Sequence, residues 1–552
     1  MIGGCVFVCF TEYIAAPADI NEIVICLKRG CAVLKKENSF IKAGAILAVS
    51  GFVVKLLSAA YRIPLTRMMG ASLMGHYSAV LNVFMPFFSV ATAGITPALS
   101  RFTAQLNSQG DDNGIYRLSR QALRLYISIA AVTSCFYLVF SKIYAQYIGE
   151  NIFFTGAVVL LPCIVMAAAE MVLKGITQGK MDMLITAKAN VAEGMVKTVL
   201  GIVLVYWALY TVQTADHNLP VMACLTAMTI SSFICFIYLV YAGRVKNTGH
   251  KKGSAISAIQ LLSMSVPIAA SALTVSLVNF FDTAVCMPLI KNLPYGEIVN
   301  SFRDASFMGA DEISMYLFGI WQGMALTVFN LDPAVMASVG TACLPVMTKA
   351  QGLKDKTGLN RQSEKLFRIT AFISVPAAAF IFLFRSEIIM FLFGITQGQA
   401  QIGAELLAMV IPFCPLACFV SAYNSVIHAH GKSAAVCKIL VVASAVKCTV
   451  SAIGCSLPQV NIRAMAISTA VFYTIIFVLS AIYISKLGVR IHFYRIFALP
   501  LAASALTALA LNIFRHKILF CLPLFLQLLF GGVVFCTAYI LVMFVMGFTV
   551  DI

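Results

Sequence analysis

Charged residues are scarce in this sequence, at 11% of 552 residues. Soluble domains usually carry about a quarter. Hydrophobic residues make up 61% of the chain, and the mean hydropathy is +0.92. These values exclude a soluble domain and predict an all-α integral membrane protein that crosses the bilayer many times.

Paired cysteine motifs and basic stripes are also missing. The 17 cysteines are scattered through apolar segments, and none forms a C-x-x-C pair. Cys5/Cys9 and Cys414/Cys418 have i,i+4 spacing, which indicates small apolar surface on a helix. We therefore expect no disulfide and no metal site. The formal net charge is +17, but no basic stripe with interleaved aromatic residues occurs, so we expect no nucleic-acid partner.

Catalytic motifs are absent as well. HGKS at 430–433 has the end of a phosphate-binding loop, but Val426 stands where the loop needs glycine. The longest loop predicted on the outer side, 291–312, contains no D-x-D pair of a glycosyltransferase. We expect the protein not to be an enzyme and to need no cofactor.

What the sequence does contain is long apolar segments, and we count fourteen predicted transmembrane helices. The segments 258–290 and 313–346 exceed the roughly 20 residues that one span needs, so we expect them to be tilted or bent. Residues 1–40 form an N-terminal extension without a clear span. The predicted spans are 41–66, 75–99, 120–141, 152–173, 187–210, 219–241, 258–290, 313–346, 366–384, 401–427, 434–455, 464–485, 492–513 and 518–547.

The distribution of Lys and Arg predicts the orientation. With the N-terminus in the cytoplasm, 27 of the 39 lie in inner segments, 8 in outer segments and 4 within spans. By the positive-inside rule, both termini are predicted to be cytoplasmic.

The chain also repeats itself. GITPALSRFTAQ at 94–105 is echoed by GTACLPVMTKAQ at 340–351, and VKTV at 196–199 by VKCTV at 446–450. The repeat spans six helices, which predicts two pseudo-symmetric parallel lobes with a substrate site near the midplane between them. The predicted divisions are the N-lobe at 41–245, the C-lobe at 258–486 and two further helices within 487–552.

Cations in and just after the first predicted span point to a functional site. Lys55 and Arg62 share one helix face, and Arg67 lies near the outer end. Charged groups in a membrane helix are costly, so we interpret these three as a site for an anionic group. The alternative is that Arg67 extends to the outer interface while Arg62 pairs with an acid.

Two further lysines fall at equivalent depths in the two lobes. Lys197 and Lys447 are 250 residues apart, which favours symmetric contributions to a cationic cavity. Alternatively, Lys197 pairs with Glu193, four residues before it on the same helix. Lys447 has no acid at that spacing and must face the cavity or a partner on another helix.

Acidic residues within spans are candidates for gating or ion coupling. Asp282 could pair with Arg62 across the lobe boundary, or bind a coupling Na⁺ or H⁺. Glu170 and Glu193 are also candidates for gating or ion coupling, and Glu170 could instead form a structural pair with Lys174. Asp332 precedes a proline and could cap a helix break.

Several motifs together resemble the stage V sporulation protein B family of the multidrug/oligosaccharidyl-lipid/polysaccharide (MOP) exporter superfamily. The resemblance covers roughly residues 38–550; it does not include residues 1–34, and the proline-containing NLDPAV departs from the family pattern. The motifs are YRIPLTRMMGASLMGHYS, TAGITPALSR, VNFFDTAVCMPLI and MALTVFNLDPAVMASVGTACLP.

The resemblance implies a fourteen-helix protein of the bacterial cytoplasmic membrane, similar to MviN-type lipid II flippases. By this resemblance it moves an undecaprenyl-diphosphate-linked saccharide outward, for spore cortex or cell-wall synthesis, with membrane lipids and the cell-wall synthesis machinery as partners. The cations of the first span would then hold the diphosphate, because guanidinium groups bind phosphates through paired, charge-assisted hydrogen bonds. Two alternatives stay open: a multidrug/cation antiporter, which would want an acid-lined cavity, and a non-transporting scaffold.

Overall fold

The computed structural model describes residues 39–211, 218–243, 256–302, 306–310, 312–352, 355–489, 494–517 and 523–546. The predicted extension at 1–40 lies almost entirely outside these ranges. The described residues form helices joined by short turns and include no β-strand, which confirms the predicted all-α class. Helices satisfy their own backbone hydrogen bonds, as a chain inside hydrocarbon requires.

The number of crossings agrees with the prediction. Thirteen helices of the described chain are long and apolar enough to span a membrane, and the first of them runs over 60 residues, from Val49 to Ser108. That stretch is broken at Gly70, so it counts as two crossings and gives fourteen.

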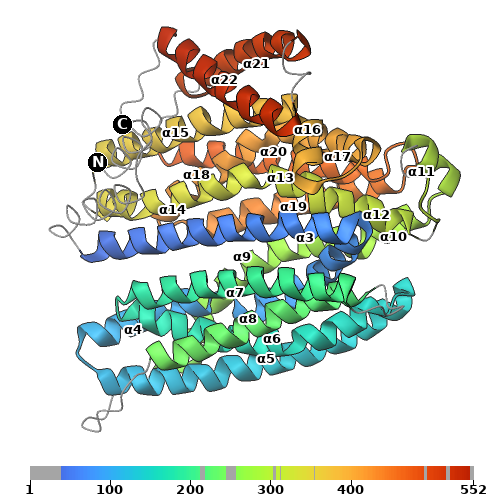
Figure 1. The fold of residues 1–552 in the computed structure, drawn as a ribbon. Helices are drawn as coiled ribbons and strands as arrows, with labels where there is room; N and C mark the ends of the chain where they lie inside the picture. The colour runs from blue at the N-terminus through green and yellow to red at the C-terminus, as the bar shows by residue number, and fades with distance from the viewer. Residues whose placement is uncertain are drawn as a thin grey trace.

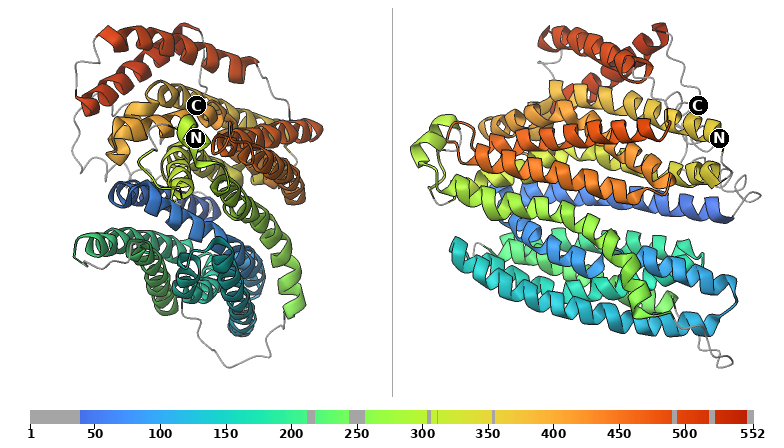
Figure 2. Two further views of the ribbon diagram at one scale, coloured as in Figure 1. Left: turned by 90° about the vertical axis from the view of Figure 1, so that its right-hand side faces the viewer. Right: turned by 180° about the vertical axis from the view of Figure 1, so that it is seen from behind.

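Gly70 divides the long helix α3 (Ser39–Thr92) into two segments, 39–69 and 71–92. Its backbone has φ 73° and ψ 180°, a conformation that residues with a β-carbon rarely adopt. The chain reverses there, and the second segment runs back at an angle to the first, into the bundle of the first half (Figures 1 and 2). Gly94 (φ 81°) makes a second break before α4 (Ile95–Ser108).

The rest of the first half consists of four long helices. They lie nearly parallel in one bundle together with α4 (Figure 1). They are α5 (Asp112–Ile148), α6 (Ile152–Gly179), α7 (Met183–Tyr210) and α8 (Leu219–Ala242).

The second half is more interrupted. Both spans that we expected to be bent contain π-helical turns, η2 (Asp282–Cys286) and η4 (Ile320–Ala325). The remaining elements are α9 (Ala258–Phe281), α10 (Met287–Lys291), α11 (Tyr295–Ser301), α12 (Ile313–Gly319), α13 (Leu326–Phe329), α14 (Leu331–Gly352), α15 (Lys356–Leu383), α16 (Arg385–Phe393), α17 (Gln397–Val410), η5 (Ile411–Phe413), α18 (Cys414–Ala429), α19 (Ser433–Cys455), α20 (Arg463–Lys486), η6 (Tyr494–Ala498), α21 (Leu499–Lys517) and α22 (Leu524–Val545).

Two bundles of helices result, as predicted. Figures 1 and 2 show α4–α8 on one side and α14–α20 on the other, with the first segment of α3 and the diagonal helix α9 between them. The last two helices, α21 and α22, lie at the outer edge of the second bundle, where Phe535 packs on Phe380. The predicted junction between the lobes falls at 245–258, mostly outside the described residues, so that boundary stays a prediction.

The two halves are held together by close helix packing and polar contacts. Ser89 and Ser276 share a hydrogen bond of 2.6 Å between α3 and α9, and Asn82 Nδ2 donates to Thr283 Oγ1 at 3.0 Å. A β-carbon added to Gly75 would lie 2.3 Å from the carbonyl oxygen of Met315. Small residues therefore let α3 and α12 approach at backbone distance.

Candidate functional site

Two cations of the first α3 segment reach across the boundary between the halves. Arg62 Nη2 donates to the carbonyl oxygen of Gln322 at 2.7 Å, and Lys55 Nζ donates to that of Ala334 at 3.0 Å. Both acceptors are backbone groups on the eighth span, at η4 and at the start of α14. The first helix is therefore tethered to the other half of the molecule by its cationic side chains.

Neither cation is neutralised in the described part of the chain. Arg62 and Lys55 form no ion pair with any described carboxylate. The Nε–H of Arg62 is buried and has no hydrogen-bond partner among the residues that the structure describes. A buried guanidinium with an unused donor is costly in a membrane protein unless an anion or water completes its bonding. The site has the charge and the free donor that an anion requires.

Arg67 lies apart from these two. Its side chain is exposed and packs over Gly394, which ends α16: a β-carbon there would lie 2.6 Å from Arg67 Nε. Arg67 therefore contacts the end of α16 and not the eighth-span carbonyls that Arg62 and Lys55 bind, and its predicted place at the outer interface stays a prediction.

Lys197 faces the same helix as Arg62. Its Nζ lies 5.6 Å from the centroid of the Tyr61 ring, a cation–π contact, and it forms no ion pair with a described acid. Because Tyr61 is next to Arg62 in the chain, this contact places Lys197 against the α3 segment that carries Lys55 and Arg62. Lys197 thus has no carboxylate partner among the described residues, as the cationic site needs.

The predicted pair between Glu193 and Lys197 is wrong. Glu193 Oε2 instead accepts from Lys174 Nζ at 3.0 Å, and Lys174 also pairs with Glu170 at 3.1 Å. Helical spacing offered only Lys197 to Glu193, whereas Lys174 stands 19 residues earlier on α6 and is brought to Glu193 by the turn between α6 and α7. The structural pair predicted for Glu170 and Lys174 is formed.

The predicted pair between Asp282 and Arg62 is also wrong. Asp282 Oδ2 lies 2.7 Å from Lys447 Nζ, and both side chains are almost fully buried. Lys447 therefore has its partner on another helix, which was one of the two expectations for it. The π-helical turn η2 begins at Asp282 and faces α19, which supplies Lys447.

The two lobes treat their equivalent lysines differently. Each lysine faces the first helix of its own lobe: Lys197 meets Tyr61, and Lys447 meets Asp282. The geometry is symmetric, as the repeat predicts, but only the second lobe supplies an acid. Of the five predicted cations, Lys447 is neutralised, while Lys55, Arg62 and Lys197 remain the set that can hold an anion.

Sequence reasoning missed the acceptors of the site. The carbonyl of Gln322 is presented by a π-helical turn, and no pattern in the sequence located that turn. It named Lys174 as a partner for Glu170 but missed the second contact, by which the buried Lys174 ammonium also binds Glu193. The i,i+4 spacing of Glu170 and Lys174 was the available signal.

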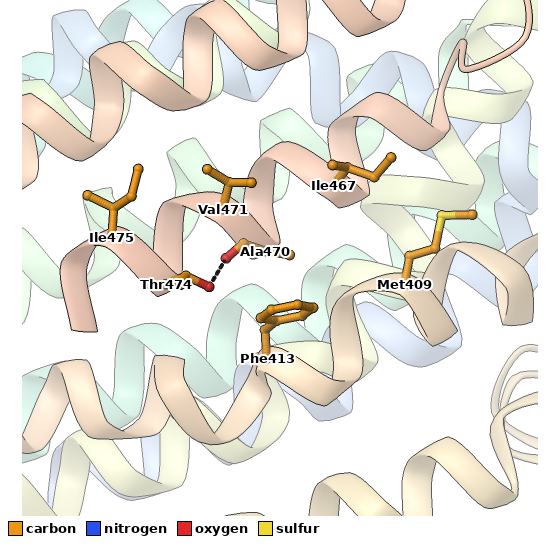
Figure 3. Close-up of a pocket in the computed structure, with 7 residues that line it drawn as sticks. All are labelled: Met409, Phe413, Ile467, Ala470, Val471, Thr474 and Ile475. Carbon is orange, nitrogen blue, oxygen red and sulfur yellow. Dashed lines mark hydrogen bonds between the residues drawn. The ribbon is translucent and has the colours of Figure 1, made fainter. Parts of the chain in front are cut away.

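One pocket of the structure is lined by none of the cations discussed above. It measures about 540 Å³, sits between α17, η5 and α20 of the second lobe, and carries no charged residue (Figure 3). Its one hydroxyl, on Thr474, already donates to the carbonyl of Ala470 at 2.8 Å. This apolar pocket suits hydrocarbon, not a charged group. It is lined by Met409, Phe413, Ile467, Ala470, Val471, Thr474 and Ile475.

Two family profiles match the chain. The polysaccharide biosynthesis protein family matches residues 40–351, which is more than half of the sequence, and the MatE family matches residues 322–453. Stage V sporulation protein B of Bacillus subtilis is 21% identical over 462 residues, covering 82% of this chain and 84% of that protein. The lipid II flippase MurJ of the same organism is 21% identical over 402 residues, covering 68% and 70%.

Solved structures share the fold. A lipid II flippase MurJ in an inward closed conformation superposes with a TM-score of 0.64 at 12% identity, over 91% of this chain and 98% of that one. An inward-facing multidrug resistance MATE family transporter of the MOP superfamily gives 0.62 at 17% identity, over 80% and 99%. The predicted resemblance to the stage V sporulation protein B family and its superfamily is confirmed by these matches.

Proposed function

The chain belongs to the polysaccharide biosynthesis protein family, and on that premise we propose that it is a flippase for a lipid-linked saccharide. The cargo is an undecaprenyl-diphosphate-linked peptidoglycan precursor or polysaccharide unit, carried outward across the bacterial cytoplasmic membrane. Both termini lie in the cytoplasm, and the protein is a transporter without catalysis. Its partners are the cargo, the surrounding lipids and the cell-wall synthesis machinery.

One observation carries the proposal: Arg62 is a cation at the boundary between the halves with a buried, unused donor and no acid partner among the described residues. A diphosphate offers several oxygens with spread negative charge. Arg binds such groups with two parallel hydrogen bonds, each roughly twice as strong as a neutral one. Lys55, on the same helix, and Lys197, which contacts Tyr61 of that helix, would add positive charge.

The carbonyl contacts suggest how cargo would move the lobes. In this structure Arg62 and Lys55 donate to the carbonyls of Gln322 and Ala334. A diphosphate is a stronger acceptor than a carbonyl and would take over these donors. Losing the two tethers frees the first helix from the eighth span, so binding would favour a different arrangement of the lobes.

Ion coupling to Na⁺ or H⁺ is part of the proposal, with Asp282 as the acid that would take the ion. Its Oδ1 is buried and has no hydrogen-bond partner in the described part of the chain, while Oδ2 pairs with Lys447. An ion at Asp282 would compete with Lys447 and would release that lysine toward the cargo. Glu170 and Glu193 are already engaged by Lys174, which makes them weaker candidates.

A MATE-type multidrug antiporter is the second candidate, favoured by the MatE match over 322–453. Cationic drugs need an exposed acid, whereas three cations here lack an acid partner in the described chain. A non-transporting scaffold for spore-wall synthesis is the third reading, and it predicts that neutral substitutions at these cations are tolerated.

The test is transport in proteoliposomes that contain the purified chain and a fluorescent undecaprenyl-diphosphate-linked saccharide. We expect Arg62→Ala to slow outward movement by roughly tenfold or more, from the loss of a charged hydrogen bond. Arg62→Lys should keep part of the rate because the charge remains. Arg101→Ala, at an exposed cation on α4, is the matched control and should leave the rate unchanged.

Separate outcomes distinguish the candidates. Export of a fluorescent organic cation without lipid movement would replace the flippase proposal with the antiporter. Equal lipid transport by Arg62→Ala and the unaltered protein, both monodisperse in detergent, would remove Arg62 from the site. Normal sporulation with an inserted but transport-inactive variant would favour the scaffold.

A further inference from the structure

A second polar cluster lies where the eighth span is broken between α13 and α14. Asp332, at the start of α14, points its Oδ2 at two thiols of α18: Cys418 Sγ at 3.3 Å and Cys414 Sγ at 3.7 Å. Cys414 Sγ also lies 3.6 Å from the carbonyl oxygen of Phe329. All four residues are buried, and the thiol and carboxylate atoms lie within 4.8 Å of one another.

The carboxylate has unusually poor partners. Among the described residues, its hydrogen bonds come only from the two thiols, which are weak donors. No described cation pairs with it, and no backbone N–H among the described residues caps it, so Asp332 does not act as the helix cap that the sequence suggested. A buried carboxylate without a cation is expensive, so the group must either take a proton or bind a cation.

We propose that Asp332, Cys414 and Cys418, with the carbonyl of Phe329, form a binding site for a thiophilic metal ion, best matched by Zn²⁺. Two sulfurs and a carboxylate are ligands that zinc prefers. In a tetrahedral zinc site with bonds of about 2.3 Å to sulfur and about 2.0 Å to oxygen, a sulfur ligand and an oxygen ligand lie about 3.5 Å apart. The observed separations of 3.3 and 3.7 Å bracket that value.

The charge balance also favours a metal. Zn²⁺ entering as the two thiols release their protons to water leaves the net charge of the buried site unchanged. The carboxylate then gains the cation that it lacks. The other cluster of potential ligands, Glu170, Glu193 and Cys235, does not have this feature because the Lys174 ammonium already lies between its two carboxylates.

A metal ion here would hold together the two parts of the eighth span, α13 and α14, at the point where the span is broken. It would join α18 to Phe329, the last residue of α13, and to the first turn of α14. The same turn presents the carbonyl of Ala334 that accepts from Lys55. Asp332 therefore lies two residues from Ala334, whose carbonyl binds Lys55 of the cationic site. The metal-site proposal does not depend on what the cationic site transports.

The experiment is metal analysis of the full-length protein in detergent, after chelation and reloading with Zn²⁺. We expect about one tightly bound Zn²⁺ per chain, and tetrahedral sulfur-ligated spectra when Co²⁺ replaces it. The double variant Cys414→Ser/Cys418→Ser should no longer bind this Zn²⁺. Asp332→Asn should weaken binding at least tenfold, on the order of what lesser changes around metal sites cause.

The control variant is Cys437→Ser/Cys448→Ser, which removes two half-buried thiols of α19 and should keep the metal. Gel filtration and thermal unfolding without zinc identify any variant that does not fold. Absence of bound metal in the unaltered protein, or full retention in Cys414→Ser/Cys418→Ser, would overturn the proposal and leave a protonated Asp332 with two thiol bonds.

Discussion

Lys447 and Asp282 form the shortest buried ion pair among the described residues, at 2.7 Å between Nζ and Oδ2. Lys447 is 5% exposed and Asp282 2%, so water cannot compensate either charge if the other is removed. Removing either residue therefore leaves a buried, unpaired charge and is strongly destabilising. This holds independently of the net stability that the intact pair contributes.

We predict that Lys447→Ala lowers the free energy of unfolding by about 3–5 kcal/mol, because it leaves a buried, uncompensated carboxylate. Asp282→Asn/Lys447→Gln should recover most of the loss, since two amides can bond to each other. Thermal unfolding in detergent measures the effect as a double-mutant cycle. Lys432→Ala, at an exposed lysine, is the control and should stay within about 0.5 kcal/mol. Additive single effects would contradict the pair.

Residue types were predictable at this scale, and their partners were not. Scarcity of charge made each intramembrane charge visible in the sequence, so Arg62, Lys197, Lys447 and Asp282 could be singled out. The pairing of Lys447 with Asp282 joins residues 165 positions apart, and no local spacing encodes such a contact. Glu193 illustrates the same limit, because its helical neighbour Lys197 lost to Lys174 from the preceding helix.

At the scale of elements, Gly70 is the position on which the first two crossings depend. Its φ of 73° with ψ of 180° belongs to a region that is essentially restricted to glycine. A β-carbon added there would meet no atom within 4 Å, so any cost of substitution comes from the backbone alone.

We predict that Gly70→Ala destabilises the protein by roughly 1–3 kcal/mol. Gly51→Ala is the matched control, since Gly51 lies in regular helix of the same element and its β-carbon would also meet nothing within 4 Å. That control should be neutral or stabilising by about 0.5–1 kcal/mol. Unfolding midpoints of the two variants test the difference, and equal midpoints would mean that the break does not need glycine.

Hydropathy predicted the existence of the spans well and their interruptions poorly. Length alone indicated that 258–290 and 313–346 would be bent. The nature of the bends, π-helical turns at Asp282–Cys286 and Ile320–Ala325, could not be read from composition, because such turns arise from packing against neighbouring helices. These turns are also where the structure places Asp282 and the acceptor carbonyl of Gln322.

At the scale of the whole molecule, the two halves meet through α3 and α9. Ser89 and Ser276 touch there, with 2.6 Å between their hydroxyl oxygens. A transporter that works by moving its lobes has to separate such contacts or pivot about them.

We predict that Ser89→Cys/Ser276→Cys forms a disulfide under oxidation and stops lipid transport in proteoliposomes, with activity returning after reduction. Each single variant, oxidised in the same way, controls for the native cysteines and should remain active. Full activity of the cross-linked protein would mean that transport does not require these helices to part.

The repeat predicted the two lobes, and the structure bears this out. It could not predict that Lys197 and Lys447, equivalent by sequence and by the helix they face, would differ in charge compensation. That asymmetry follows from a single position, because Tyr61 meets the lysine of the first lobe and Asp282 that of the second. The repeat thus predicts a similar backbone in the two lobes, while the proposed function depends on side chains that differ between them.

The ion pair between α9 and α19 has a consequence for biosynthesis. A chain is inserted into the membrane from its N-terminus, so the helix with Asp282 enters long before Lys447 has been synthesised, 165 residues later. An unpaired charge at the centre of a span costs about 2.5–3.5 kcal/mol on insertion. The nascent protein must shelter that carboxylate until its partner arrives. In a chain that ends before Lys447, the Asp282 carboxylate would stay unpaired, and membrane proteases could recognise the incomplete protein by it.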